Sequence, residues 1–475
     1  MRTLSQIAQC VLPAVACCVS VLLAAGTALG QESVDGLQQG STQQQPMSDR
    51  AEVAVVSRGQ AAFDAGCVQC HDAERSLSKS KTLSGWLSTV RRMAAKDGAT
   101  VPPGDVDPIA QYLASLPDSS GGETLAGAEG DSQWSFSATV SPLWRGSSDA
   151  IENAGFFPDA WIGGHWQSRG PISATVTVCT SCHSDQNSGR GFTLEFVEAS
   201  ATIDLVKALF PEQHAETRVQ AELKAGRFVV PFGAFSALSH PGAYRTLTNP
   251  LMFNMGRRVA SGGALQPVLP MPYADEGANL HLAAQVHDDS QISTDFYAVN
   301  GLQAAGPGAN FDLSRSYVDN NREPAVGGRA KFGGAHWQIG ASVMSGQMHD
   351  EGATPRGYHI MGADAILRGD LGRAYFEYAL RRDDPQGTPV DQNDTYGIVI
   401  ETELNVTQKI SLLTRYDTLE HRHVQAGEMT TERMTWGFNF LLPNGSLLLV
   451  NHEHWMFPDA ALDIDIIGMR WTSTF

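Results

Sequence analysis

From about residue 133 to the C-terminus, apolar and polar residues alternate in segments of about ten residues. In one such segment, Ala374, Phe376, Tyr378 and Leu380 fall on one face, and Arg373, Tyr375, Glu377 and Arg381 fall on the other. The same division recurs in 337–343, 396–404 and 434–440. A period of two with one apolar face is typical of transmembrane β-strands, although the strands of a soluble β-sandwich also alternate.

Three further features favour a membrane barrel. The last strand places Ile467, Met469, Trp471 and Phe475 on one face, and a terminal aromatic residue resembles bacterial outer-membrane proteins. Bacterial barrels have short periplasmic turns and long external loops. Connections here alternate between short ones near 333–334, 368–370, 405–408 and 443–445 and long ones near 346–356, 383–393 and 418–431. The polar face carries arginine together with glutamate, which suits a wet lumen.

We therefore predict an antiparallel transmembrane β-barrel over residues 133–475, in the bacterial outer membrane. The count comes to about 16 strands, and an even number places both ends of the barrel in the periplasm. The predicted strands are 133–142, 157–167, 172–180, 191–202, 219–230, 277–288, 291–301, 326–334, 335–345, 357–367, 371–382, 394–405, 408–418, 431–442, 445–455 and 462–475.

A long segment, 231–276, interrupts this regular pattern. Its aromatic and apolar content predicts an external loop that folds into the lumen, since loops this long are usually functional or disordered. Acidic residues such as Glu401 and Glu403 on the polar face could attract cations, although polar lumens are expected in any porin. His421, His423, His452 and His454 fall near external strand ends; a metal or mineral contact is one interpretation, and solvated loop histidines are the simpler one.

The N-terminal part of the chain has a different organisation. Residues 1–30 are typical of a secretory signal peptide, with Arg2 as the only charge and an apolar stretch before Ala28-Leu29-Gly30. Residues 31–50 form a predicted disordered tether, and 118–132 form a Pro/Gly/Ser/acidic linker. Between them, 51–117 is a small helical unit with predicted helices at 51–66, 83–95 and 107–116. The formal charge of −18, which becomes −19 without the leader, argues against nucleic-acid binding.

Two pentapeptides carry the strongest chemical signal. Cys67-Val68-Gln69-Cys70-His71 and Cys179-Thr180-Ser181-Cys182-His183 both have the C-x-x-C-H spacing of covalent haem attachment. In each motif the two thiols bind the porphyrin, and His71 or His183 is the proximal iron ligand. The alternatives are a zinc site, which leaves the adjoining histidines unexplained, and a pair of disulfides. We predict two covalently attached haem c groups.

The first motif lies in a unit that resembles small class I cytochrome c domains at GCVQCH, GWLSTVRRM and IAQYLASL. This resemblance implies that Met93 is the sixth ligand, opposite His71; a core methionine is the alternative. The strand at 172–180 would deliver the second motif to the external end of the barrel. Its sixth ligand stays open between His165, His240, Met252 and Met255, and for each an ordinary pore or loop residue is the simpler interpretation.

The order of leader, C-x-x-C-H unit, linker and barrel resembles the porin–cytochrome fusions of bacterial outer membranes, including those that oxidise extracellular Fe(II). Those iron-oxidising fusions carry one N-terminal haem, so the second motif departs from their pattern. The resemblance implies electron transfer between periplasmic carriers, such as soluble cytochromes c, and an extracellular donor or acceptor. The alternatives are a diffusion porin fused to a periplasmic cytochrome and a haem peroxidase-like enzyme.

Overall fold

The computed structural model describes residues 58–60, 62–63, 86, 89–90, 93–94, 101, 103–115, 132–148, 155–180, 194–211, 219–253, 267–287, 290–305, 308–311, 314, 323–334, 336–348, 356–384, 393–423, 427–442 and 445–475. Several predictions fall outside these residues: the signal peptide, the tether and most of the linker, and the site residues Cys67, Cys70, His71, Cys182, His183 and Met255. The chain divides into two compact units, 1–51 and 52–475, and every described residue belongs to the second.

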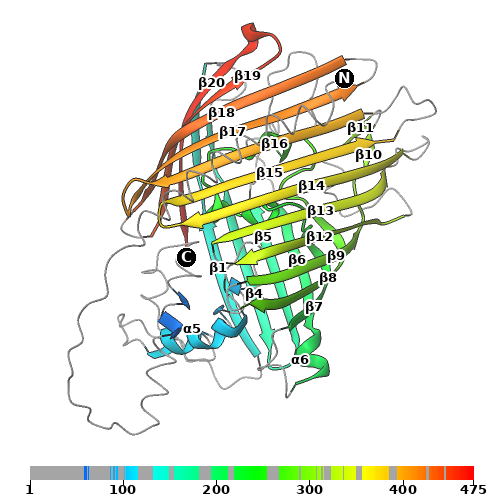
Figure 1. Ribbon diagram of the computed structural model, residues 1–475, viewed down its shortest axis with the longest axis vertical. Coiled ribbons are helices and arrows are strands. Elements are labelled where there is room, and N and C mark those ends of the chain that lie inside the picture. Colours follow the sequence, from blue (N-terminus) through cyan, green and yellow to red (C-terminus); the bar gives the residue numbers. More distant parts are fainter. Residues whose placement is uncertain are drawn as a thin grey trace. The chain divides into compact units, whose positions relative to one another are not determined.

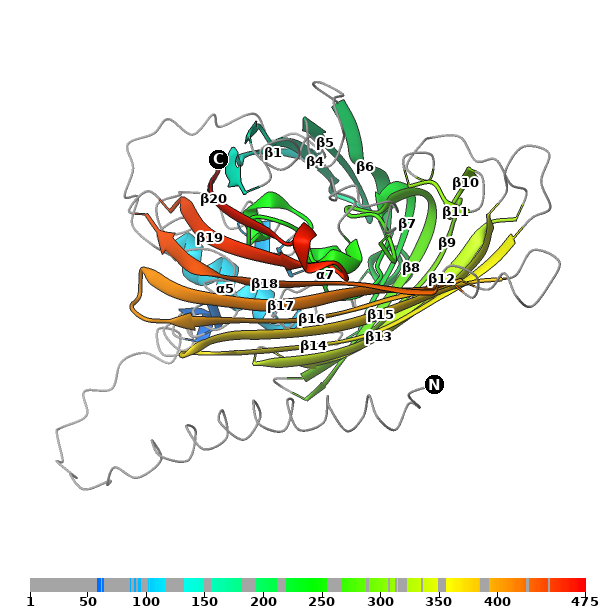
Figure 2. The ribbon, with the colours of Figure 1, turned by 90° about the horizontal axis from the view of Figure 1, so that it is seen from above.

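Residues 132–475 fold into a closed antiparallel β-barrel (Figures 1 and 2). The barrel closes where Thr139 and Val140 pair with Thr474 and Ser473. The strands are β1 (Ser132–Val140), β2 (Leu143–Ser147), β3 (Gly155–Phe157), β4 (Ala160–Ser168), β5 (Ile172–Thr180), β6 (Leu194–Asp204), β7 (Val219–Val229), β8 (Ala274–His287), β9 (Ser290–Val299), β12 (Ala325–Gly334), β13 (Trp337–Met348), β14 (Arg356–Gly369), β15 (Gly372–Asp383), β16 (Asn393–Asn405), β17 (Ile410–His423), β18 (Gly427–Leu441), β19 (Leu447–Met456) and β20 (Ile464–Thr474), with a separate hairpin of β10 (Ala304–Ala305) and β11 (Gly308–Ala309).

The main sheet has 18 strands, but within the described residues they make 16 transmembrane strands. β1 and β2 both pair with β20 and form one interrupted strand, and β3 and β4 form the next. Each interruption lies at a proline, Pro142 or Pro158, which has no N–H to donate to the ladder. The prediction of an antiparallel barrel of about 16 strands is confirmed.

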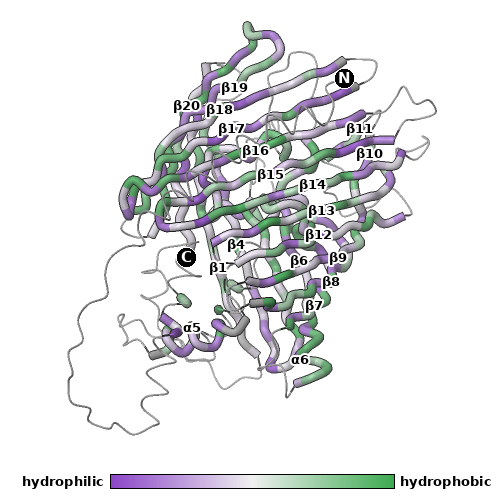
Figure 3. Tube along the Cα trace, in the orientation of Figure 1, coloured by the Kyte–Doolittle hydropathy of each residue, from purple (hydrophilic) through white to green (hydrophobic). Residues whose placement is uncertain are grey.

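The two faces of the strands follow the predicted alternation. On β15, Tyr375, Glu377 and Ala379 are buried inside the barrel. On β18, Trp436 and Phe438 are 45% and 47% exposed on the outer surface, where they would face lipid. Figure 3 shows the resulting alternation of hydrophobic and hydrophilic positions along the strands.

The two ends of the barrel differ in the length of their connections. The short-turn end carries 169–171, 205–218, 288–289, 335–336, 370–371, 406–409 and 442–446. The long-loop end carries 148–154, 181–193, 230–273, 300–324, 349–355, 384–392, 424–426 and 457–463. The prediction of a long connection at 418–431 is wrong, because β17 continues to His423 and β18 begins at Gly427. The 205–218 connection is longer than the others at its end and contains α6 (Leu205–Leu209).

The described residues near the N-terminus are helical at 58–60, 62–63, 86, 89–90 and 93–94, and α5 spans Pro103–Ser115. α5 therefore begins four residues before the predicted 107. The backbone of Gly59 approaches α5 closely: a Cβ at that glycine would lie 2.0 Å from the carbonyl oxygen of Pro108. The buried core of this part consists of Phe63, Trp86, Val90, Val101, Val106, Ile109, Ala110, Tyr112 and Leu113. Across the described part of the chain, no helix has the length and hydropathy to cross a membrane.

Candidate functional site: the segment inside the barrel

The connection between β7 and β8 spans residues 230–273, and the parts of it that the structure describes fold into the barrel; we call these parts the inner segment. Its described parts, 230–253 and 267–273, include α7 (Phe235–Leu238) and the 3-10 turns η1 (Pro241–Ala243) and η2 (Leu251–Phe253). Figure 2 shows α7 within the ring of strands. Leu247, Leu251 and Phe253 are fully buried there. The prediction that this segment folds into the lumen is confirmed, although β8 begins at Ala274, three residues before the predicted 277.

One side of the inner segment is held by apolar packing. It belongs to a hydrophobic cluster that also includes wall residues of β13–β17, β19 and β20. Met252 packs directly on β16, since a Cβ at Gly397 would lie 2.5 Å from the Met252 Cβ. The cluster includes Phe228, Val230, Phe232, Phe235, Leu251, Met252, Phe253, Val268, Leu269, Met271 and Tyr273 together with Met344, Ile360, Ile366, Tyr375, Val399, Leu419, Trp455, Ile464 and Ile466. Burial on this scale holds the inner segment against the wall.

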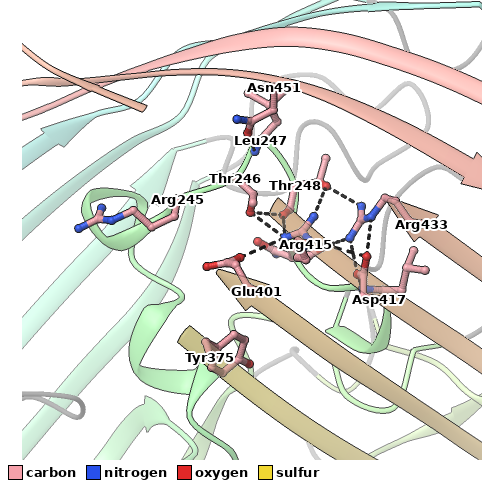
Figure 4. A network of polar contacts seen from close by, with 12 residues as sticks. Arg245, Thr246, Leu247, Thr248, Tyr375, Glu401, Arg415, Asp417, Arg433 and Asn451 are labelled. Atoms are coloured by element: carbon pink, nitrogen blue, oxygen red, sulfur yellow. Dashed lines mark hydrogen bonds and ion pairs between the residues drawn. The ribbon is translucent and has the colours of Figure 1, made fainter. Parts of the chain in front are cut away.

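The polar anchor of the inner segment is the arginine clamp, Arg415 of β17 and Arg433 of β18 (Figure 4). Arg415 donates to Thr246 Oγ1 at 2.7 Å and to the Thr248 carbonyl at 2.8 Å. Arg433 donates to Thr248 Oγ1 at 2.6 Å and to the Asn249 carbonyl at 2.7 Å. Charged donors bound to backbone carbonyls are among the stronger hydrogen bonds in proteins. The clamp therefore fixes the backbone of residues 246–249 to the wall.

Two carboxylates complete the arginine clamp. Asp417 accepts two hydrogen bonds from Arg433, at 3.0 and 2.6 Å, and a third from the Leu251 backbone N–H at 2.6 Å. Glu453 accepts from Thr248 Oγ1 at 2.6 Å. The side chains of both arginines are fully buried, as are these carboxylates to within 1%. Buried charges are tolerated when they are paired and hydrogen-bonded in this way.

Further wall residues hold the segment at Leu247 and Arg245, within and next to the part that the clamp binds. Arg470 of β20 donates to the Leu247 carbonyl at 2.7 Å, and the Leu247 N–H donates to Asn451 Oδ1 at 3.1 Å. Arg245 of the segment is ion-paired with Glu403 at 3.3 Å, and Glu401 is ion-paired with Arg373. Because both glutamates are paired with arginine, neither is a free cation-attracting group in the lumen.

A second loop packs beside the inner segment and depends on one glycine. Gly301 has a φ of +100°, and its N–H donates to Asp275 Oδ2 at 2.7 Å. A Cβ there would lie 2.7 Å from the Tyr358 hydroxyl and 2.8 Å from Ala325 Cβ. The next residue, Leu302, is fully buried and donates its N–H to that hydroxyl at 2.9 Å. This loop therefore requires glycine at its first turn.

Gly301→Ala is expected to destabilise the barrel by about 1–3 kcal/mol, because it combines a strained φ with two close contacts. Urea unfolding of detergent-solubilised protein, followed by tryptophan fluorescence, would measure the change. Gly369→Ala is the matched control, since nothing lies within 4 Å of the added methyl group. Equal midpoints for the two variants would contradict the assignment of strain to Gly301.

Of the second haem motif, the structure describes Cys179. It is the last inward-facing residue of β5, opposite Trp161 and Glu195, and is fully buried with Trp161, Val197 and Ala274. Cys179 is disulfide-bonded.

Three of the predicted sixth ligands, His165, His240 and Met252, lie in the described residues. The His240 ring packs edge-on against Trp161 at 5.0 Å, but its Nδ1 accepts the Gly242 N–H, so its proton sits on Nε2. His165 bonds Thr175 at 3.0 Å and lies four residues below Trp161 on β4, about 13 Å along the strand. Met252 packs on β16, as described above.

The histidines near the external strand ends are on strands, so the prediction of solvated loop residues is wrong. His452 and His454 of β19 both contact Asp465 Oδ1 of β20, at 3.1 and 2.9 Å, on the outer face. His421 of β17 is hydrogen-bonded to Thr395 at 3.2 Å. Within the part of the chain described here, no group of three or more His, Cys, Asp or Glu side chains is arranged to hold a metal ion.

The sequence matches no protein-family model and no curated protein. In structure, the chain is similar to the anion-selective porin of Comamonas acidovorans, with 10% identity, 72% of this chain and 100% of that chain covered, and a TM-score of 0.50. It is also similar to the outer-membrane channel DcaP of Acinetobacter baumannii (8% identity, 73% and 99% covered, TM-score 0.48) and to Salmonella typhi OmpF in complex with daunomycin (8%, 72% and 98%, 0.47). The fold is thus that of an outer-membrane porin-type β-barrel.

Proposed function

We propose that the barrel is a channel whose width is set by the inner segment. The observation that carries this proposal is the arginine clamp, which ties residues 246–251 to the wall through buried, charge-assisted hydrogen bonds. A segment held by paired buried charges is a fixed part of the lumen and not a plug that swings out. Solutes would then pass along the wall that the segment leaves uncovered.

The polar residues on that uncovered wall support this route. On β6, β7 and β8, the side chains of Glu198, Lys224 and His281 face the interior and keep 22%, 33% and 24% of their surface exposed. Glu198 and Lys224 form an ion pair at 2.9 Å, and His281 bonds Asp295 at 2.9 Å. Mixed charges with partial exposure are typical of a water-filled lumen. By contrast, the arginines against the inner segment are fully enclosed.

Conductance in planar lipid bilayers would test the channel. Purified full-length protein is expected to give discrete, stepwise conductance increments, as a fixed narrow lumen predicts. Heat-modifiable migration on gels would show that the barrel is folded. If such protein gives no conductance increments above the bare bilayer, the proposal is overturned.

We propose electron transfer by the N-terminal unit as a second function, since the C-x-x-C-H at Cys67–His71 favours it. Cys67 and Cys70 would hold the porphyrin, His71 would be the proximal ligand, and the bound haem would supply one-electron redox chemistry. Trp86 and Val90 are buried in the unit's core, and Met93 is half-buried on the same predicted helix, at 83–95, which suits its proposed role as sixth ligand. A core this small gains stability from a covalently held apolar group.

A second haem at Cys179, Cys182 and His183 is proposed from the motif alone. A thioether forms from a free thiol, so a dithiol reductant would first have to reduce the Cys179 disulfide and be oxidised to a disulfide itself. With both groups, electrons would pass between periplasmic carriers, such as soluble cytochromes c, and an extracellular donor or acceptor. Extracellular Fe(II) is the candidate donor, on the resemblance to iron-oxidising fusions. With the first group alone, the chain would be a channel that carries one haem unit.

A further inference from the structure

The connection between β6 and β7 exposes two large apolar side chains at the short-turn end. Leu209, the last residue of α6, is 68% exposed, and Phe210 is 55% exposed. No residue of α6 is buried. Figure 3 shows α6 as a hydrophobic element at the end of the barrel. Isolated exposed apolar residues are common, but adjacent bulky ones beside a lipid-facing wall call for an explanation.

These side chains continue the lipid-facing surface of the barrel. Ile172 of β5 and Ile203 of β6 are directly opposed and 44% and 37% exposed on the outer face. Val219, the first residue of β7, is 48% exposed. α6 follows Ile203 after one residue, so the exposed Leu209 and Phe210 lie at the end of the apolar outer surface of β5–β7.

The helix is fixed at this rim. Asp204 caps it by accepting the Lys207 N–H at 2.8 Å, and the Asp204 N–H donates to the Pro171 carbonyl at 2.8 Å. The Lys207 ammonium donates to the Gly170 carbonyl in the neighbouring turn at 2.9 Å. The Phe210 N–H closes the helix on the Val206 carbonyl at 2.8 Å. Leu209 and Phe210 are therefore presented from an anchored turn, with a lysine beside them at the rim.

We propose that α6 is an interfacial anchor that inserts Leu209 and Phe210 into the periplasmic leaflet of the outer membrane, against phospholipid. Short turns of bacterial barrels face the periplasm, so this rim meets that leaflet. Aromatic and aliphatic side chains next to a lysine are typical of membrane interfaces. The apolar side chains contact the ends of the acyl chains nearest the headgroups, and the ammonium group binds lipid phosphate. The continuity with the lipid-facing wall selects phospholipid over a protein partner as the occupant.

Photocrosslinking of the full chain in phosphatidylethanolamine–phosphatidylglycerol vesicles would test the anchor. Phe210→p-benzoylphenylalanine changes an exposed ring into a photoreactive one. After irradiation, mass spectrometry is expected to find phospholipid adducts at 210 with the yield of the lipid-facing control, Ile203→p-benzoylphenylalanine. Lys224→p-benzoylphenylalanine, inside the barrel, is expected to give none.

Two results would overturn the proposal. One is the loss of lipid adducts at 210 while Ile203→p-benzoylphenylalanine still forms them. The other is an adduct at 210 to a peptide of a second copy of the chain, which would make this rim a protein interface. Leu209→p-benzoylphenylalanine repeats the measurement at the neighbouring position. A lipid adduct at 209 without one at 210 would also reject the proposed anchor, because the proposal requires both side chains to insert into the leaflet.

Discussion

Replacing Cys67 and Cys70 by alanine is expected to lower covalently bound haem by one full equivalent per chain. Thioether attachment needs both thiols of the C-x-x-C-H motif for complete retention through denaturation. The small N-terminal core is also expected to loosen, because a unit of about 65 residues makes a thin core without a bound group. Pyridine haemochrome absorbance per polypeptide, in wild type and in Cys67→Ala/Cys70→Ala, would measure the loss. Limited proteolysis of the N-terminal unit would report the loosening.

The matched control is Cys179→Ala/Cys182→Ala. Two haems in the wild type that fall to one in this control would establish both motifs as attachment sites. One haem in both would leave Cys179 in its disulfide and assign the whole signal to the first motif. An unchanged haem content in Cys67→Ala/Cys70→Ala would contradict the proposed electron-transfer function at its first step.

The barrel could be predicted from the sequence because each of its strands repeats a local rule. In a strand that faces lipid on one side and a polar interior on the other, apolar and polar residues must alternate. The residue type therefore predicts that Trp436 faces lipid and that Thr435 faces the interior. The prolines at 142 and 158 mark where two strands are interrupted. The boundaries of β17 and β18 are harder to predict from the sequence, because both strands extend beyond the apolar band. Residues in these extensions, such as Arg422 and Glu428, are charged and resemble loop residues.

The contacts of the inner segment could not be predicted in the same way. Its apolar content indicates that it folds inward, but Thr248 meets Arg415, Arg433 and Glu453 across more than 160 positions of sequence. Such partners are determined by barrel closure and strand register, which no local pattern encodes. The signal available in the sequence was coarser: inward-facing arginine and acid on neighbouring strands. It located the wall that carries the clamp, but not the segment that the clamp binds.

Arg433→Met is expected to release the inner segment and to raise single-channel conductance. The change removes four hydrogen bonds, to Thr248, Asn249 and Asp417, and the ion pair with Glu453, and it leaves Asp417 buried without its main partner. Breaking a buried pair from one side typically costs about 3–5 kcal/mol. The cost falls on the docked state of the segment, because the barrel ladder itself does not use this side chain. Conductance in planar bilayers and hydrogen exchange of residues 245–253 would be measured together.

Arg382→Met controls for the loss of an arginine on the same wall. Arg382 is ion-paired with Asp394 at 3.0 Å but is 48% exposed on the outer face, where such pairs contribute about 0–1 kcal/mol. It is expected to leave conductance and exchange unchanged. If Arg433→Met speeds exchange in the segment yet conductance stays at the wild-type value, the segment is clamped but does not set the channel width. If neither changes, apolar packing around Met252 holds the segment, and the clamp only neutralises its own charges.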